Sequence, residues 1–174
     1  DNNGLLDMPL MRDTSTGQPV ILGSTLAGAL RAYLQRSSKD MAEALFGNVD
    51  ADEDKSCESW VLVVDAHVKK TITTELRDGV GIDSITRTAG ARLKYDLELL
   101  EAGTEFEIQF ELLPPKKHPD FEDAFYQALS GLNGEIHLGK RKRRGFGECH
   151  AENWRIWSYR FPTDLVRWLE KPCA

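Results

Sequence analysis

Hydrophobic residues recur at helical spacing in three parts of the chain, and capping or turn-forming residues mark the ends of each part. The first pattern predicts a helix over residues 24–36, with Ser24 as its N-cap. The second predicts a shorter helix over residues 39–46 that begins after Ser38 and stops at Gly47. The apolar face of the first helix consists of Leu26, Leu30, Tyr33 and Leu34.

The third helical pattern follows a proline-rich loop. Acidic residues at its start suit the positive end of the helix dipole, and Asn133-Gly134 closes the pattern. Its apolar stripe is Phe121, Phe125, Leu129 and Leu132, and its acidic residues are Asp120, Glu122 and Asp123.

Hydrophobic residues that alternate with polar ones predict strands elsewhere. Residues 93–99 and 106–112 alternate in this way and are joined by the glycine-containing segment 101–104, so they predict a hairpin with one buried face. Short strands are also expected at residues 136–138 and near Trp154. The side chains expected on one face of an earlier strand are Trp60, Leu62, Val64, Ala66 and Val68.

The order helix, strand, hairpin, helix, strand indicates an α+β fold that resembles a ferredoxin-like sheet without its opening strand. Residues 1–22 hold no alternating segment long enough to open such a sheet, and residues 20–22 are the best available. Either the chain begins late or a partner supplies the strand, and the sequence favours a late start.

Composition fits one domain over residues 1–174, because hydrophobic residues make up 41% and charged residues 29% of the chain. The sequence has no apolar run of bilayer length and no secretory signal, so no membrane partner and a cytoplasmic location are expected. Three widely spaced cysteines argue against a disulfide framework, and they favour unrelated thiols over a zinc site with His150. Phosphate-loop, HExxH and GxSxG motifs are absent from the sequence.

The net charge of −6 argues weakly against nucleic acid, but the cations are unevenly distributed. Residues 140–144 are five consecutive cations between Gly139 and Gly145. Glycines give a loop the freedom to approach a ligand closely, and the cations can neutralise phosphates. Phe146 can stack on a base or anchor the loop. The pattern favours nucleic-acid binding over a solvated charge run. The cations are Lys140, Arg141, Lys142, Arg143 and Arg144.

The start of the first helix is a second candidate. Free N–H groups and the helix dipole there attract anions, and the hydroxyls of Ser24 and Thr25 add donors. The same residues also fit an ordinary capped core helix with Gly28 at a packing position, and this segment alone favours that interpretation.

A third candidate is the stiff segment from Asp7 to Asp13, in which Pro9 prevents a helix. A carboxylate here beside RNA could orient a water, a metal ion or a 2′-hydroxyl, although alone it is an exposed aspartate. The glycine-rich residues 78–83 predict a protruding loop. After them, Arg87 and Thr88 are either backbone contacts or ordinary turn residues.

Several weak motifs in a fixed order strengthen this picture. The segments GLLDMPLMRD, GQPVILGSTLAGALR, RDGVGIDSITRTAGARLKYDLELL and HLGKRKRRGFGEC resemble the RAMP superfamily, and within it the repeated backbone subunit of type III CRISPR effector complexes. The resemblance runs from about Gly4 to Glu148. It implies a ferredoxin-like (RNA-recognition-motif) core with an inserted thumb at about residues 67–90. It also implies guide RNA (crRNA), target RNA and neighbouring RAMP subunits as partners.

The resemblance further implies that Ser24, Thr25, Arg31 and the basic loop face the guide backbone. Asp7 matches an aspartate that supports metal-dependent cleavage of target RNA, with a divalent ion, Mg²⁺, as cofactor, whereas Asp13 fits a structural role in a turn. Two departures stand out, namely the absent opening strand and a short thumb. They fit a truncated chain or one domain of a larger fused polypeptide. Alternatives are a scaffold without cleavage, a repeat-RNA-processing endoribonuclease, or an interaction module without RNA.

Overall fold

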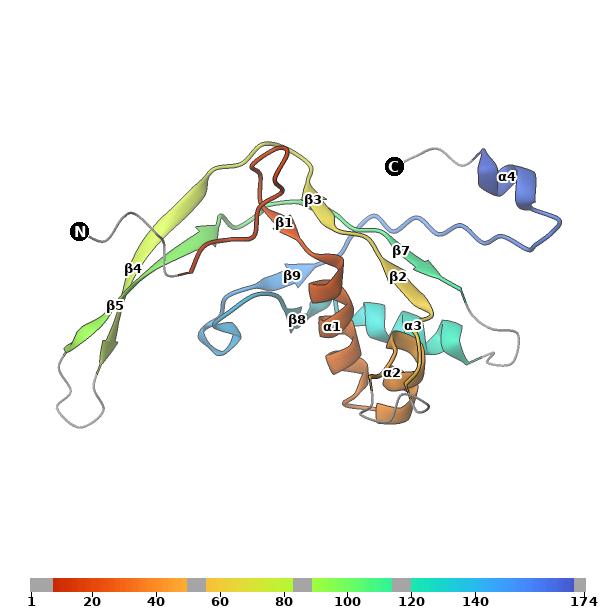
Figure 1. Ribbon diagram of the computed structural model, residues 1–174, viewed down its shortest axis with the longest axis horizontal. Helices are drawn as coiled ribbons and strands as arrows, with labels where there is room; N and C mark the ends of the chain where they lie inside the picture. The colour runs from red at the N-terminus through yellow and green to blue at the C-terminus, as the bar shows by residue number, and fades with distance from the viewer. Residues whose placement is uncertain (1–7, 50–55, 83–88, 114–119, 171–174) are drawn as a thin grey trace.

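The computed structural model describes residues 8–49, 56–82, 89–113 and 120–170, with the backbone alone for residues 80–82 and 89–94. Figure 1 shows three helices gathered beneath a curved run of strands, with a long two-stranded ribbon extending to one side. The elements are β1 (Val20–Ile21), α1 (Gly23–Leu34), α2 (Lys39–Phe46), β2 (Val61–Val63), β3 (Ala66–Val68), β4 (Thr74–Ile82), β5 (Ala89–Leu100), β6 (Phe106–Glu107), β7 (Phe110–Leu112), α3 (Phe121–Ser130), β8 (Asn133–His137), the 3-10 helix η2 (Lys142–Arg144), β9 (Glu148–His150) and α4 (Leu165–Leu169).

The prediction for α2 is confirmed. α3 forms as predicted but ends at Ser130, before the predicted stop at Asn133-Gly134, and Asn133 begins β8 instead. The Ser38 hydroxyl accepts a hydrogen bond from the Met41 N–H at 3.3 Å, which caps α2. Gly47 ends the helix with φ of 84°, a backbone conformation that favours glycine. The apolar stripe of α3 faces inward, where Phe121 and Phe125 are buried.

The core forms where α1, α2 and α3 pack together against β2 (Figure 1). Full burial of each leucine or phenylalanine side chain stabilises the fold by about 1.5–3 kcal/mol. The buried residues of this cluster are Leu30, Leu34, Ala42, Leu45, Val61, Phe121, Ala124, Phe125, Ala128, Leu132 and Ile136. None of the helices in the described parts combines the length and apolar character needed to span a bilayer.

The sequence predicted Ser24 as the N-cap of α1, and this prediction is wrong. The cap position belongs to Leu22, and Ser24 lies exposed in the first turn without a capping bond. A distant carboxylate takes this role instead, because the Gly23 N–H donates to Asp65 Oδ1 at 2.7 Å. A side chain at Gly23 would place its Cβ 2.2 Å from the Val63 carbonyl oxygen, so α1 begins where β2 ends.

The α+β class is confirmed, and the strands form several small antiparallel sheets. Among the described residues the pairings are β1-β3-β6, β2-β7, β4-β5 and β8-β9. Residues 20–22, the best strand candidate near the N-terminus, do contribute β1, which pairs with β3.

The predicted hairpin between residues 93–99 and 106–112 is wrong. β5 pairs with β4, from Thr74 opposite Leu100 onward. β6 and β7 pair instead with β3 and β2. The turn at residues 101–104 exists, with Gly103 at φ of 84°, but it joins strands of different sheets. Alternation fixes the face that a strand buries but does not select its partner, and β5 finds a longer continuous partner in β4.

The predicted strand over residues 60–68 is interrupted. β2 and β3 are separated at Val64 and Asp65, and the break changes which residues face the core. Val61 and Ala66 are buried, whereas Leu62 is 54% exposed. The chain breaks here because Asp65 turns to cap α1. No strand forms around Trp154, which is exposed and stacks on Phe110 at 6.4 Å between ring centroids.

β4 and β5 form the ribbon that extends away from the helices in Figure 1. The sequence predicted a protruding glycine-rich loop at residues 78–83. The described part, residues 78–82, protrudes as strand β4 rather than as a loop, because it pairs along β5.

Candidate nucleic-acid interface

The basic loop, residues 139–147, is held at its base by the Leu138 N–H, which donates to the Gly147 carbonyl at 2.8 Å. Gly139, Gly145 and Gly147 all have positive φ angles, near 80°. A side chain at Gly147 would place its Cβ 1.8 Å from the Leu138 carbonyl oxygen, so only glycine fits there. The prediction that glycines shape this loop is confirmed.

The five cations of the basic loop differ in exposure. Lys140, Lys142, Arg143 and Arg144 are exposed, and none forms an ion pair with a described residue. Arg141 is half-buried, with its guanidinium carbon 4.0 Å from the centroid of the Tyr95 ring. Within the part of the chain that the structure describes, these four cations present positive charge to solvent without an ion-pair partner, which is what a phosphate contact requires.

A cavity of about 250 Å³ lies on one side of the basic loop, between α1 and β8. Lys142 and Arg143 line it from the loop, and Arg36 lines it from the end of α1. Tyr33 also lines it, and its hydroxyl donates to Glu135 Oε1 at 2.9 Å. The loop and α1 thus share a groove with three cations and one carboxylate.

A second cavity, of about 120 Å³, lies where the loop meets the β4–β5 ribbon. Arg141, Arg144 and Phe146 line it from the loop, and Arg77 and Tyr95 line it from the ribbon. Arg77 is paired with Glu75, its Nε lying 2.9 Å from Oε1. The structure therefore places Phe146 at the loop–ribbon junction.

Sequence reasoning missed Arg36, Arg77 and Tyr95 as parts of this surface. No linear signal marks them, because Arg36 and Arg77 are isolated cations and Tyr95 alternates in an ordinary strand pattern. They join the basic loop only through the packing of α1 and of the β4–β5 ribbon against it.

The start of α1 is already occupied by negative charge. The Asp65 carboxylate accepts the first N–H of the helix, so a phosphate there would meet a carboxylate. Ser24 and Thr25 are exposed. Arg31 lies 3.9 Å from Glu43 and 3.5 Å from Asn48, measured between guanidinium and side-chain oxygens. The structure brings the second half of α1, not its first turn, against the basic loop.

Asp7, Arg87 and Thr88 lie outside the described residues. The chain immediately after Asp7 is fixed along β5. The Met8 N–H donates to the Asp96 carbonyl and the Glu98 N–H donates to the Met8 carbonyl, both at 3.2 Å.

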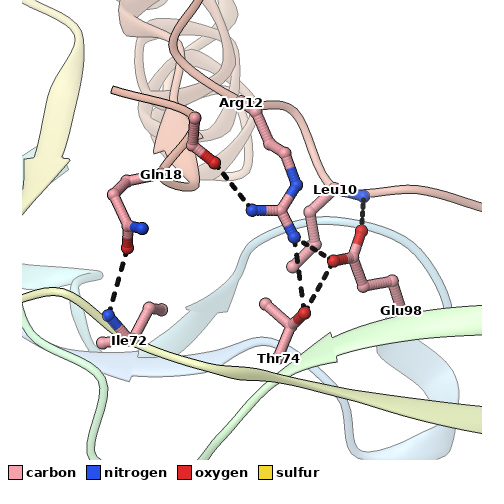
Figure 2. Close-up of polar contacts among 7 residues, drawn as sticks. Leu10, Arg12, Gln18, Ile72, Thr74 and Glu98 are labelled. Carbon is pink, nitrogen blue, oxygen red and sulfur yellow. Dashed lines mark hydrogen bonds and ion pairs between the residues drawn. The ribbon is translucent and has the colours of Figure 1, made fainter. Parts of the chain in front are cut away.

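Figure 2 shows the side chains that secure this segment around Glu98, which is 5% exposed. Its carboxylate accepts the Leu10 N–H at 2.9 Å, the Thr74 hydroxyl at 2.7 Å and the Arg12 guanidinium. Burial opposes ionisation, but these donors outweigh it, so the pKa of Glu98 lies below its ordinary value. Arg12 also donates to the Gly17 carbonyl at 2.8 Å. Residues 8–12 are thereby tied to the base of the ribbon.

Asp13 has the structural role predicted from its place before a turn. Its Oδ1 accepts hydrogen bonds from the hydroxyl and N–H of Ser15 and of Thr16, at 2.6–3.0 Å. The Ser15 hydroxyl, followed by the donors of Thr16, lowers the pKa of Asp13 to about 2. Asp13 is therefore an ionised residue whose Oδ1 is fully engaged by the hydrogen bonds of the turn.

Within the described ranges, no group of three or more histidine, cysteine or acidic side chains is arranged to hold a metal ion. Cys57 and Cys149 are free thiols. The Cys149 thiol donates to the Ile136 carbonyl at 3.1 Å, and burial raises its pKa. The described residues therefore do not by themselves fit a divalent ion.

The family model of the RAMP superfamily matches residues 2–150, and the chain belongs to this superfamily. A comparison with curated protein sequences finds no match.

Solved structures with the same fold come from CRISPR complexes. A chain of the type III-B Cmr-beta complex bound to cognate target RNA is similar at 18% identity and a TM-score of 0.57, over 80% of this chain and 47% of that one. A chain of a CRISPR RNA-guided surveillance complex is similar at 15% identity and a TM-score of 0.54, over 76% of this chain and 55% of that one. A chain of a type IV-B CRISPR complex is similar at 17% identity and a TM-score of 0.52, over 89% of this chain and 83% of that one. The chain thus spans about half the length of the first of these proteins, and the likeness shows the fold.

Proposed function

We propose that this chain is a guide-RNA-binding subunit of a CRISPR effector complex, in which it lies beside other RAMP subunits. One observation carries the proposal: a RAMP-family chain presents four exposed loop cations without ion-pair partners among the described residues. A glycine-shaped loop with such charge suits the backbone of a single-stranded RNA.

The cavities on the two sides of the basic loop extend this surface. Arg36 adds a cation beside Lys142 and Arg143, and Arg77 adds one beside Arg144. An RNA strand that crosses the loop would meet positive charge before and after it. The net charge of −6 does not prevent this, because the cations are concentrated in the basic loop, although Glu135 lines the first cavity and Glu75 pairs with Arg77 at the second.

The finer proposal is a type III backbone subunit with a ferredoxin-like core and the β4–β5 ribbon as its thumb. In it, Asp7 supports cleavage of target RNA paired to the guide. The anchoring of residues 8–12 by Glu98 supports this role, since a reacting carboxylate needs a rigid mount. A divalent ion, Mg²⁺, would be held by Asp7 together with RNA phosphates, since a carboxylate and phosphate oxygens are the ligands that this ion takes.

The first experiment is expression of the chain with a CRISPR guide locus, followed by purification and extraction of bound nucleic acid. We expect RNA of guide length with the wild-type chain and little RNA with the Arg143→Ala/Arg144→Ala variant. The matched control is Arg155→Ala/Arg167→Ala, which removes the same charge from arginines that contact Glu107 and Ser158 instead.

The control variant should retain its RNA. Equal loss of RNA from both double variants would mean that only total charge matters. A wild-type chain that carries no RNA would favour an interaction module, whereas an Asp7 variant that binds and still cleaves target RNA would favour a scaffold with the nuclease elsewhere.

A further inference from the structure

Tyr95 of β5 pairs directly with Gly79 of β4 across the ribbon. A Cβ at Gly79 would lie 2.0 Å from the Tyr95 ring, so only glycine lets the ring rest on the backbone of β4. This close approach fixes the ring along the ribbon, between its base at Thr74 and the pair of Val80 with Lys94.

Arg141 lies on this ring and differs from the other loop cations. Its guanidinium carbon is 4.0 Å from the ring centroid, a favourable distance for a cation–π contact. Its Nε is buried without a hydrogen-bond partner among the described residues. Arg144 and Phe146 share the cavity beside this contact. Arg141 therefore joins the loop to the ribbon, whereas Arg143 and Arg144 remain exposed.

The loop needs such a contact because its three glycines allow many backbone conformations. A loop that must be ordered when RNA binds loses affinity to the entropy of ordering. We propose that Tyr95 is a positioning residue that holds the basic loop in its RNA-binding conformation by stacking against Arg141. The inference rests on the proposed RNA-binding function and divides the loop cations by role. Arg141 fastens the loop, and the exposed cations contact phosphate.

The test compares Tyr95→Leu, Tyr95→Phe and Gly79→Ala in the full chain. Tyr126→Leu is the control, since Tyr126 is an exposed tyrosine of α3 whose hydroxyl contacts Glu122. The first readout is limited trypsin digestion without RNA, with cleavage after residues 140–144 followed by mass spectrometry. The second is the affinity for fluorescein-labelled single-stranded RNA across salt concentrations.

We expect Tyr95→Leu and Gly79→Ala to be cut faster in the loop and to bind RNA about tenfold more weakly, because a desolvated cation–π contact is lost. The slope of log K against log salt should stay at its wild-type value, since no phosphate-binding charge is removed. Tyr95→Phe keeps the aromatic face and should behave as wild type.

Two results would overturn the inference. One is loop cleavage in Tyr95→Leu no faster than in Tyr126→Leu, and the other is a loss in Tyr95→Phe as large as in Tyr95→Leu. A wild-type chain without salt-dependent RNA binding would instead overturn the proposed function. The trypsin digestion would still decide whether Tyr95 holds the loop.

Discussion

Removal of the Glu98 carboxylate is expected to destabilise the base of the ribbon. Glu98 is 5% exposed and accepts hydrogen bonds from Leu10, Thr74 and Arg12. Hydrogen bonds to a charged group are worth about 1.5–3 kcal/mol each. The 39% exposed Arg12 side chain regains water when its partner is lost, which reduces the cost. Glu98→Ala should therefore lower the free energy of unfolding by about 2–4 kcal/mol, or roughly 6–12 °C in Tm.

The pH dependence of this effect has a definite sign. The pKa of Glu98 is about 4.5 in the unfolded chain and lower in the folded chain. At a pH between the unfolded and the folded pKa, the unfolded state therefore binds more protons. The stabilisation is complete above 4.5 and declines as pH falls through the folded pKa. Urea unfolding at neutral and acid pH measures it, with Glu101→Gln as an exposed control. Two results would refute the reasoning. One is a Glu98→Gln variant that is as stable as this control at neutral pH, and the other is a loss of stability relative to the wild-type chain that grows as the pH falls.

Three further predictions concern single residues. Ser24→Ala should lower the free energy of unfolding by less than about 1 kcal/mol, the typical cost of removing a cap, because Ser24 makes no capping bond. Thermal unfolding measures this, and a loss of about 1 kcal/mol or more would contradict it. Asp7→Asn should stop target cleavage by assembled complexes while target binding persists; cleavage at the wild-type rate would remove Asp7 from the mechanism. Gly147→Ala should unfold at lower denaturant and bind RNA more weakly, because its Cβ would meet the Leu138 carbonyl. Gly103→Ala, with similar φ but open space, should bind RNA normally.

Features set by neighbouring residues could be predicted from the sequence. Ser38 and Gly47 bound α2 as expected because a cap and a positive φ are local requirements. The basic loop followed from its glycines and cations for the same reason. Its flanking cavities did not, since Arg36 and Arg77 reach it from separate elements.

Features set by distant residues were mispredicted. The group that caps α1 is Asp65, 42 positions beyond Gly23, so the nearby Ser24 was the wrong choice. Glu98 occupies the polar side of an alternating strand, which indicates exposure. It is buried because residues 8–12 return to lie along β5. Strand partners depend on such long-range packing, which alternation does not encode.

The salt dependence of RNA binding tests the central claim most directly, because it counts the charges that touch phosphate. For the wild-type chain and single-stranded RNA, log K should fall linearly with log salt. Arg143→Ala/Arg144→Ala should reduce the magnitude of this negative slope by roughly 1.4, which is twice the contribution of about 0.7 per phosphate contact. Arg155→Ala/Arg167→Ala should leave it unchanged. Equal slopes for the wild-type chain and the loop variant would contradict the claim that the basic loop grips the RNA backbone.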